Sequence, residues 1–476
     1  MKPLRLVFYT IFLIVLGGRF SLPPTLADDA TIIVGGEGGA WHDLQAALDA
    51  APEGALVEVH GGTYTGHIEI SKPLTLRGVN WPVIDGLNQG SIISISAPDV
   101  TISGFVIRNS GSSLDEENAG IESEAPRTVI ENNRFENILF GVYLREAHNS
   151  VIRANTFVGK EVDLPRRGDA IRVWSSHNTT IEGNRVSRGR DVVLWYSEHL
   201  LVRENIVEDG RYGLHFMYCD DADVSRNILR HNSVGAFLMY SRRLHLHHNR
   251  IESNRGPSGY GVGLKDMDDA IIEENIFADN RIGAFLDNSP REVDSTMRFA
   301  HNVFAYNDIG VAMLPSVKRN EFYANSFIEN VQQVAIEGGS GGDLSGNTWQ
   351  GNYWSDYAGF DANNDGIGDV PYRAQRLFEN LTERKPETRI LLYSPVMQAV
   401  EFAARVAPLV QPQPKFEDTQ PRMQPSFPQG IPALPPPSPI PMLLLGVSLL
   451  SIAGGIMLVA MPRRKQTHLH IAQVGV

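Results

Sequence analysis

Hydrophobic and polar positions alternate along the middle of the chain in a unit that repeats every 21 to 23 residues in most places. Each unit is marked by an Asn that has one apolar residue three positions before it and another two positions after it. Ten segments carry this pattern, at Asn133, Asn155, Asn184, Asn205, Asn227, Asn249, Asn275, Asn302, Asn325 and Asn347. Short runs of branched and aromatic residues between Gly and Asn turns are typical of strands, not helices.

The length of the repeat predicts the fold class. A unit of this size made of short strands cannot bury its own apolar face, whereas units stacked about 4.8 Å apart form a continuous core. We therefore predict an all-β fold, a right-handed parallel β-helix over residues 112–372, with the Asn side chains in an internal ladder. Longer spacings predict loops that leave the coil at 160–168, 255–259 and 288–295.

The segments on either side of the repeats have patterns of their own. Residues 28–111 contain the amphipathic stretch WHDLQAALDAA at 41–51 and then Gly-rich strands, which predicts a short N-terminal capping helix and the first, less regular coils. Residues 373–407 form a C-terminal extension in which Ser394 and Pro395 are suited to begin a helix. Residues 408–441 are rich in Pro and Gln, so we expect an extended linker without a core.

The two termini carry apolar segments. A basic start, an apolar run and small residues before position 28 predict a secretory signal peptide at 1–27. Twenty uncharged residues at 442–461, followed by three basic residues, predict a C-terminal transmembrane helix with a cytoplasmic tail at 462–476. The body would then be periplasmic or extracytoplasmic and anchored to the cytoplasmic membrane.

The amino-acid composition excludes several kinds of partner and metal site. The net charge is −13 and no stretch is strongly basic, so nucleic acid is a poor candidate partner. The single cysteine, Cys219, excludes an internal disulfide framework and any metal site built from several cysteines.

Alternation within the strands predicts an outward stripe of aromatic and thioether residues. His215 and Met217 alternate along one strand, and Met239 would stack over Met217 in the next coil. Two thioethers and an imidazole suit soft Cu(I), so these three residues are a candidate site for transiently bound copper. Apolar surface of this extent also indicates an interface, and the two interpretations are compatible. The candidate partner-binding residues are Trp174, Trp195, Tyr196, Tyr218, Phe237 and Tyr240.

Two further groups are candidate metal ligands. His231, His245, His247 and His248 cluster around Asn249, but with no carboxylate or thioether at a fixed spacing we expect solvated surface. Asp361, Asn363, Asp365, Gly366 and Asp369 match positions 1, 3, 5, 6 and 9 of a calcium-binding loop, while the twelfth position holds Tyr372 instead of an acid. The alternatives there are a calcium site and a turn held by Asx side chains.

Three stretches together resemble the NosD family, the periplasmic maturation proteins of nitrous oxide reductase. They are GNYWSDYAGFDANNDGIGDVPY at 351–372, RYGLHFMYCDD at 211–221 followed by VGAFLMYS, and SPVMQAVEFAARV at 394–406. The resemblance implies a pectin-lyase-like β-helix of the CASH-domain type that has no turnover of its own. Such a protein works with an ABC-type permease and ATPase, receives copper from a lipoprotein chaperone and helps assemble the copper–sulfide centre of nitrous oxide reductase.

The same resemblance assigns roles to residues of this chain. The copper route would use His215, Met217 and Met239, and the helix at 394–406, with Pro395, Met397 and Phe402, would dock on the permease. The proline-rich linker and the membrane segment depart from the family pattern, since typical members end soon after that helix.

Two functions of other classes stay open. A polysaccharide lyase or epimerase on the same scaffold would need an acidic groove with a positioned base. Its candidate residues are Asp220, Asp221, Lys265, Asp266, Asp268 and Asp269, in runs where solvated turns are the default. A binding-only adhesin or scaffold would use the aromatic stripe without a metal.

Overall fold

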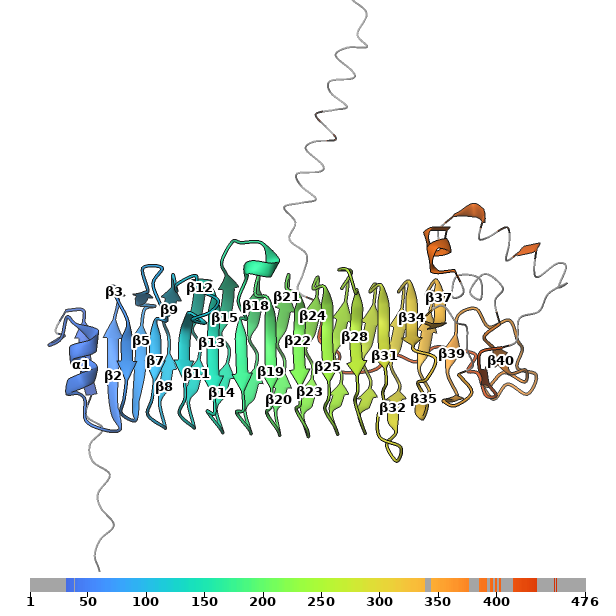
Figure 1. Ribbon diagram of the computed structural model, residues 1–476, viewed down its shortest axis with the longest axis horizontal. Helices are drawn as coiled ribbons and strands as arrows, with labels where there is room; N and C mark the ends of the chain where they lie inside the picture. Colours follow the sequence, from blue (N-terminus) through green and yellow to red (C-terminus); the bar gives the residue numbers. More distant parts are fainter. Residues whose placement is uncertain are drawn as a thin grey trace, which may run out of the picture. The chain divides into compact units, whose positions relative to one another are not determined.

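The computed structural model describes residues 31–37, 39–338, 344–375, 385–391, 394–396, 399, 402–403, 414–434, 449 and 451. The strands from β1 at Thr31 to β39 at Trp354 form a right-handed parallel β-helix in which three long sheets run side by side from α1 to the last coils (Figure 1). The predicted all-β parallel β-helix is therefore confirmed.

Each sheet takes one strand from each coil. The 14-stranded sheet contains β1 (Thr31–Gly35), β2 (Ala55–His60), β5 (Leu74–Val79), β8 (Thr101–Ser103), β11 (Val129–Glu131), β14 (Val151–Arg153), β17 (Thr180–Glu182), β20 (Leu201–Arg203), β23 (Asp223–Ser225), β26 (His245–His247), β29 (Ile271–Glu273), β32 (Met297–Ala300), β35 (Asn320–Tyr323) and β38 (Thr348–Gln350). The 12-stranded sheet contains β4 (Ile68–Ile70), β7 (Ile93–Ile95), β10 (Ala119–Ser123), β13 (Phe140–Arg145), β16 (Ile171–Trp174), β19 (Asp191–Trp195), β22 (Tyr212–Met217), β25 (Val234–Met239), β28 (Tyr260–Lys265), β31 (Ile282–Asp287), β34 (Ile309–Met313) and β37 (Gln332–Ile336).

The third sheet has 13 strands and closes the coils. It contains β3 (Thr63–Thr65), β6 (Val83–Asp85), β9 (Val106–Arg108), β12 (Arg134–Ile138), β15 (Thr156–Gly159), β18 (Arg185–Ser187), β21 (Ile206–Glu208), β24 (Ile228–Arg230), β27 (Arg250–Glu252), β30 (Ile276–Ala278), β33 (Val303–Ala305), β36 (Ser326–Ile328) and β39 (Tyr353–Trp354). The short helices are α1 (Leu44–Ala50), η1 (Leu164–Arg166) in the first predicted loop, and η2 (Pro386–Leu391).

The marker residues from Asn133 to Asn325 form the expected internal ladder, but the prediction for the tenth, Asn347, is wrong. Asn325 donates to Asn352 as the next member, whereas Asn347 accepts from Asn320 in a separate pair. Asn227, fully buried, donates its Nδ2–H groups to Asn249 Oδ1 at 3.0 Å and to the Val202 carbonyl at 2.9 Å. Its own Oδ1 accepts from the backbone N–H and the Nδ2 of Asn205. The amides thereby satisfy the backbone groups of a tight turn that would otherwise be buried without partners.

A second ladder runs five residues after the first and was not predicted. It contains Asn232, Asn254, Asn280, Asn307 and Asn330, and it uses the same contacts, such as the Asn254 backbone N–H with Asn280 Oδ1 at 3.0 Å. Two polar ladders and stacked Phe rings, for example Phe277 and Phe304 with centroids 5.0 Å apart, fix the register of successive coils.

The N-terminal helix is shorter than expected. Asp43 accepts a hydrogen bond from the Ala46 backbone N–H at 2.9 Å and caps α1, so the helix begins at Leu44 and Trp41 lies before it. Leu44, Ala47 and Leu48 are buried against the first coils. The helix therefore covers the open end of the core, as predicted.

The proline-rich segment packs against the solenoid at its start. The expected free linker begins at residue 408, but β41 (Glu417–Asp418) pairs antiparallel with β40 (Tyr372–Arg373). Phe416 stacks on Trp349 with ring centroids 4.0 Å apart. Asp418 accepts from Asn352 and Trp354, and so it ends the Asn ladder.

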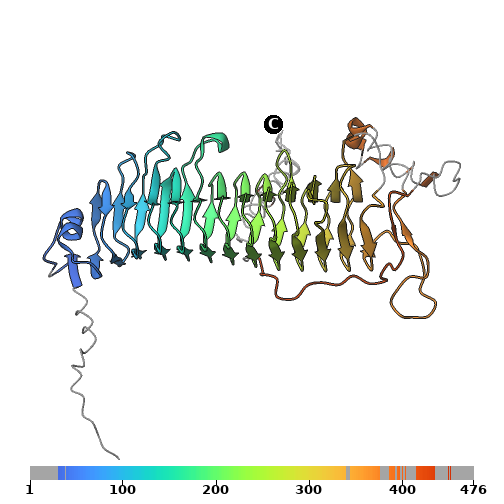
Figure 2. The same cartoon turned by 60° about the horizontal axis from the view of Figure 1, so that its bottom comes forward.

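The chain then continues in extended form along the coils to residue 432 (Figure 2). Ser426 and Ser326 exchange hydrogen bonds at 2.9 Å, and Arg250 Nε donates to the Pro432 carbonyl at 3.1 Å. The segment is extended as expected but docked instead of free, because aromatic and carboxylate side chains near its start fill the open end of the core.

The predicted terminal segments lie almost wholly outside the described residues. The signal peptide at 1–27, the tail at 462–476 and nearly all of 442–461 lie outside the described residues. Within the described part of the chain, no helix has the length and apolar character needed to cross a membrane. The transmembrane helix stays a prediction.

Candidate functional site

The predicted outward column lies on the 12-stranded sheet. Met217 of β22 pairs in register with Trp195 of β19 on one side and with Met239 of β25 on the other. Both thioethers are half-buried on the outer face, and Lys265 follows Met239 in the next coil. The two methionines are thus neighbours in adjacent coils, as the repeat predicted.

His215 is on the same outward face but is almost covered. Its ring is 7% exposed because Trp195 and Tyr212 pack edge-on against it, with ring centroids at 5.3 and 4.9 Å. The sequence predicted a wet position here. The difference arises from Tyr212, which begins the same strand and folds its ring over the imidazole.

Asp191 orients the His215 ring and was not predicted as a site residue. Its Oδ2 lies 3.3 Å from His215 Nδ1, and because a carboxylate can only accept, Nδ1 carries the proton; in a neutral ring Nε2 then has the lone pair. Metal-binding histidines commonly have this kind of carboxylate partner. The sequence did contain a signal, because the position fourteen residues before the marker Asn holds Gly or Ala in the other coils from Asn133 to Asn275.

Asp191 stays ionised although it is fully buried. Burial alone would raise its pKa, but hydrogen bonds from His215 and Arg211 hold the pKa below its ordinary value. Arg211 contacts both carboxylate oxygens, with Nε 2.9 Å from Oδ1. One coil earlier, burial raises the pKa of Asp169 to about 6, despite an ion pair with Arg190 at 3.1 Å.

Aromatic side chains form ladders beside this column. Tyr196, Tyr218 and Tyr240 stack with centroids 5.1 and 5.0 Å apart, and the first two are 43% and 46% exposed. Each has a positive φ, so each ring sits at the same left-handed turn after its strand. Trp174 packs edge-on against Trp195 at 5.7 Å. The candidate partner-binding residues of this sheet therefore form one continuous surface, which Phe237 extends beside Tyr212.

Cys219 belongs to the interior. It is fully buried, its Sγ donates to the Leu194 carbonyl at 3.0 Å, and burial raises the pKa of its thiol to about 12. A thiol that stays protonated is a poor metal ligand and a poor nucleophile.

The histidine cluster differs from the expected solvated surface. His245 and His247 share the outward face of β26, and Asp223 of β23 pairs in register with His245. Among the residues that the structure describes, Asp223, His245 and His247 form a group whose ligand atoms all lie within 4.8 Å of one another. His231 lies on an exposed turn and is not part of this group.

The candidate calcium loop is held by its own side chains. Asp361 accepts from the backbone N–H groups of Asp365 and Gly366, and Asn363 and Asp365 make similar contacts. Asp369 accepts from the Ala362 backbone N–H at 2.7 Å. These contacts fit the Asx-turn alternative, and the calcium interpretation stays a prediction.

The predicted docking helix is described only in part. Pro395, Val396 and Phe402 are helical, and Phe402 is 68% exposed, while Met397 lies outside the residues whose placement is described. An exposed aromatic side chain is available there for a partner.

The candidate residues of a lyase or epimerase do not converge. Asp221 pairs with Arg243, Asp220 accepts from the Arg242 backbone N–H, and Lys265 lies 3.9 Å from Asp287. Asp266, Asp268 and Asp269 accept hydrogen bonds from neighbouring turns at Asn288, Arg291 and Thr296. They support the coil-to-coil turns.

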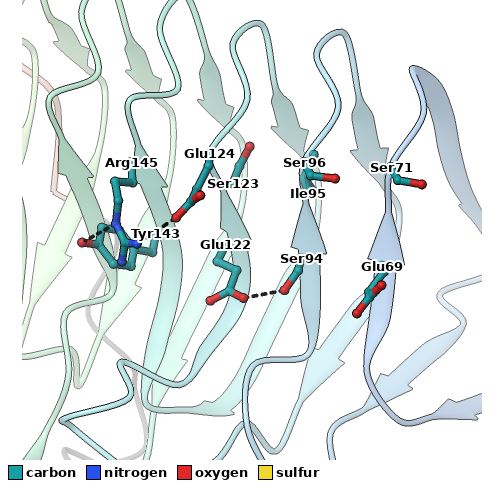
Figure 3. Close-up of a pocket in the computed structure, with 10 residues that line it drawn as sticks. All are labelled: Glu69, Ser71, Ser94, Ile95, Ser96, Glu122, Ser123, Glu124, Tyr143 and Arg145. Carbon is teal, nitrogen blue, oxygen red and sulfur yellow. Dashed lines mark hydrogen bonds and ion pairs between the residues drawn. The ribbon is translucent and has the colours of Figure 1, made fainter.

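A hollow of about 430 Å³ lies on the N-terminal part of the 12-stranded sheet (Figure 3). Glu69, Glu122 and Glu124 line it together with Tyr143 and Arg145. Ser94 donates to Glu122, and Arg145 pairs with Glu124 at 2.8 Å. No sequence pattern indicates this hollow, because its residues come from four separate coils.

Comparisons with known proteins bear on this arrangement. The family model described as "Periplasmic copper-binding protein (NosD)" matches residues 156–359, which include both methionines and His215. A protein of Pseudomonas aeruginosa named "Probable ABC transporter binding protein NosD" is 30% identical over 376 residues, covering 76% of this chain and 87% of that protein. The chain belongs to the NosD family. A NosD protein of Stutzerimonas stutzeri with the same name is 29% identical over 379 residues, covering 76% of this chain and 85% of that protein.

Solved structures extend the likeness beyond the NosD family. The A-module of the Azotobacter vinelandii mannuronan C-5 epimerase AlgE4 has a TM-score of 0.53 and 14% sequence identity, and the match covers 66% of this chain and all of that module. The A-module of AlgE6 gives a TM-score of 0.50 at 14% identity, covering 64% of this chain and 93% of that module. At this identity the likeness shows a shared β-helix and nothing about chemistry.

Proposed function

We propose that this chain is an exported periplasmic accessory protein that handles copper during the maturation of nitrous oxide reductase. In this proposal it receives Cu(I) from a lipoprotein chaperone, works with an ABC-type permease and ATPase, and helps assemble the copper–sulfide centre. Family membership and the names of the two relatives support the class of function. The C-terminal segment at 442–461 would hold the protein at the membrane.

The observation that carries the proposal is the in-register pair of half-buried thioethers, Met217 and Met239, beside an imidazole that Asp191 orients. Thioethers bind soft Cu(I) and not hard cations such as Ca²⁺ or Mg²⁺. An arriving ion would meet the sulfur atoms first, since His215 is covered by rings. Weak, partly covered ligands suit a transient cargo better than a permanent cofactor.

The aromatic surface around this column is the proposed docking face for protein partners. Tyr196 and Tyr218 are exposed and Tyr240 is half-buried, and all three flank the thioethers, so a partner seated there would cover the ion during transfer. The helix that includes Phe402 would contact the permease.

The test is the affinity of the purified protein for Cu(I), measured by competition with a chromophoric Cu(I) chelator. We expect the double variant Met217→Ala/Met239→Ala to bind Cu(I) at least 100-fold more weakly. Met267→Leu is the matched control, because Met267 is fully buried in the core and its loss removes a thioether without changing the outer face. Unchanged affinity in the double variant, with a native circular dichroism spectrum, would remove the assigned site.

A carbohydrate-active enzyme is the second candidate, and the hollow with Glu122 and Arg145 is the observation in its favour. Incubation with polyuronates, followed by ultraviolet detection of unsaturated ends and NMR detection of epimerised residues, separates the two functions. The accessory function predicts no product, whereas turnover that Glu122→Gln abolishes would establish the enzyme.

A further inference from the structure

We infer that Asp223, His245 and His247 form a second metal site, on the 14-stranded sheet, for a divalent transition ion of the Zn²⁺ or Cu²⁺ class. His245 and His247 point outward from β26 on either side of the buried Leu246. Asp223 extends from the neighbouring strand β23, in register with His245. Three ligand side chains thus come from two strands whose backbones are fixed by the sheet.

The distances are close to those of a coordinated ion. Asp223 Oδ2 lies 3.1 Å from His247 Nε2 and 3.8 Å from His245 Nδ1. Ligand atoms about 2.0–2.1 Å from a tetrahedral Zn²⁺ lie about 3.3 Å from one another. The two distances to Asp223 lie within about half an ångström of that value, and the ligand atoms of His245 and His247 lie within 4.8 Å of each other. The three side chains are 17% to 42% exposed, so solvent and an ion can reach the group.

Surrounding residues already orient the three ligands. Ser225 donates its hydroxyl to Asp223 Oδ1 at 3.1 Å, which leaves Oδ2 directed at the imidazoles. Glu273 of β29 lies 2.9 Å from His245 Nε2, so in a neutral ring that nitrogen carries the proton and Nδ1 has its lone pair on the side of Asp223. A carboxylate on the far nitrogen of a ligating histidine is a usual feature of metal sites.

The contacts around His247 outnumber the N–H groups that two neutral imidazoles can donate. Asp223, His247, His248 and Glu274 form a chain of three close contacts, at 3.1, 3.0 and 2.8 Å. Both ends are carboxylates that only accept, and two neutral imidazoles supply only two N–H groups. The third contact therefore needs one more proton or a cation.

A cation at Asp223 resolves this shortage with both imidazoles neutral. His247 Nε2 then coordinates the ion, His247 Nδ1 donates to His248, and His248 Nε2 donates to Glu274. Each ring nitrogen of His247 and His248 has a partner in that arrangement.

The donor set specifies the class of ion. Two imidazole nitrogens and one carboxylate oxygen favour Zn²⁺ or Cu²⁺ over hard Ca²⁺ and Mg²⁺, and no thioether is among them to favour Cu(I). Three protein ligands leave a fourth position open, as in exchangeable or catalytic sites and unlike closed structural sites. The inference goes beyond the proposed function and does not depend on it.

The test is Zn²⁺ binding to the purified full chain, measured by competition with a chromophoric zinc chelator. We expect one ion bound with high affinity, an affinity loss of at least 100-fold in His245→Ala/His247→Ala, and a loss of 10- to 100-fold in Asp223→Asn. His231→Asn is the control, because His231 lies outside the group and Asn tolerates its left-handed backbone.

Two further measurements distinguish loss of the metal site from loss of the fold. Circular dichroism and the unfolding midpoint of each variant show whether the fold is intact, and a Cu²⁺ electron paramagnetic resonance spectrum reports nitrogen ligands directly. Equal Zn²⁺ affinity in the wild type and in a folded double variant would overturn the inference. The Cu(I) affinity of the same variant should stay within twofold, so the two sites succeed or fail separately.

Discussion

Two neighbouring coils carry different chemistry on two of their faces. On the 12-stranded sheet, β22 and β25 present thioethers and one nearly covered imidazole. On the 14-stranded sheet, β23 and β26 of the same coils present a carboxylate and two accessible imidazoles. The ladders fix the spacing equally on both faces, so the kind of ion that each face suits depends on the side chains at its outward positions.

The two faces also differ in how they hold their histidines. His215 is oriented by a buried carboxylate that Arg211 neutralises, in a setting closed by aromatic rings. His245 and His247 lie in a wetter network of carboxylates, and the pKa of His247 is lowered by burial even though Asp223 opposes that shift. A shielded soft site and an open site of nitrogen and oxygen ligands can therefore coexist a few residues apart.

The largest expected effect is a loss of folding stability from a substitution in the internal Asn ladder, which supports both faces. Replacing Asn227 with Leu leaves the partners of its amide buried and unpaired, at about 1–3 kcal/mol for each group. We expect a loss of about 4 kcal/mol in the free energy of unfolding, measured by urea denaturation. Asn149→Gly, at an exposed turn with positive φ, is the control. A loss below about 1 kcal/mol in the Asn227 variant would mean that the ladder does not support the coils.

The next effect concerns the buried acid behind the 12-stranded sheet. The pKa of Asp169 is about 6 in the fold, above its unfolded value, so ionisation is disfavoured in the folded state. Its contribution to stability is therefore present below about pH 4 and is lost as the pH rises through 6. Relative to the wild type, Asp169→Asn should gain about 3 kcal/mol between pH 4 and pH 7. Parallel stability curves for the two proteins would contradict the buried-acid assignment.

A smaller expected effect is a change in metal affinity that is confined to one of the two faces. Asp191→Asn keeps the size of the side chain but removes the charge that orients His215, and loss of such a partner commonly weakens metal binding 10- to 100-fold. We expect about a tenfold loss of Cu(I) affinity and unchanged Zn²⁺ affinity. Nitrogen-15 shifts of His215 should report a changed tautomer. An equal loss for both ions would indicate a general structural role.

The smallest expected effect is the reaction of the Cys219 thiol with a labelling reagent in the native protein. Because its thiol has a pKa of about 12 and is buried, a thiol reagent should leave the native protein unlabelled while labelling it fully in urea. Mass spectrometry measures this directly. Rapid labelling of the native state would place Cys219 on the surface and add a sulfur ligand to the Met217 face.

The repeat made much of this arrangement predictable. The Asn spacing predicted the coils, and period-two alternation placed Met217 and Met239 on one outward column. The same register places Asp223 one coil before His245, but the spacing of the histidines along the chain does not by itself indicate this carboxylate partner. The repeat does not predict how neighbouring side chains on the outer face pack against one another. The covering of His215 by Tyr212 therefore did not follow from the sequence.

The C-terminal segment shows a different limit. Its proline content predicted an extended chain, which is correct, but composition carries no information about where such a chain lies. Phe416 and Asp418 decide that by filling the open end of the core and ending the Asn ladder. Those contacts depend on residues more than 60 positions away.

X-ray absorption of the purified protein loaded with one equivalent of Cu(I) is the most direct test of the copper assignment. The proposed site predicts two sulfur neighbours at about 2.3 Å, taken from ordinary metal–sulfur distances, together with one nitrogen neighbour. Both sulfur neighbours should disappear in Met217→Ala/Met239→Ala. A spectrum with nitrogen and oxygen neighbours alone would contradict the account and would place the copper elsewhere on the β-helix.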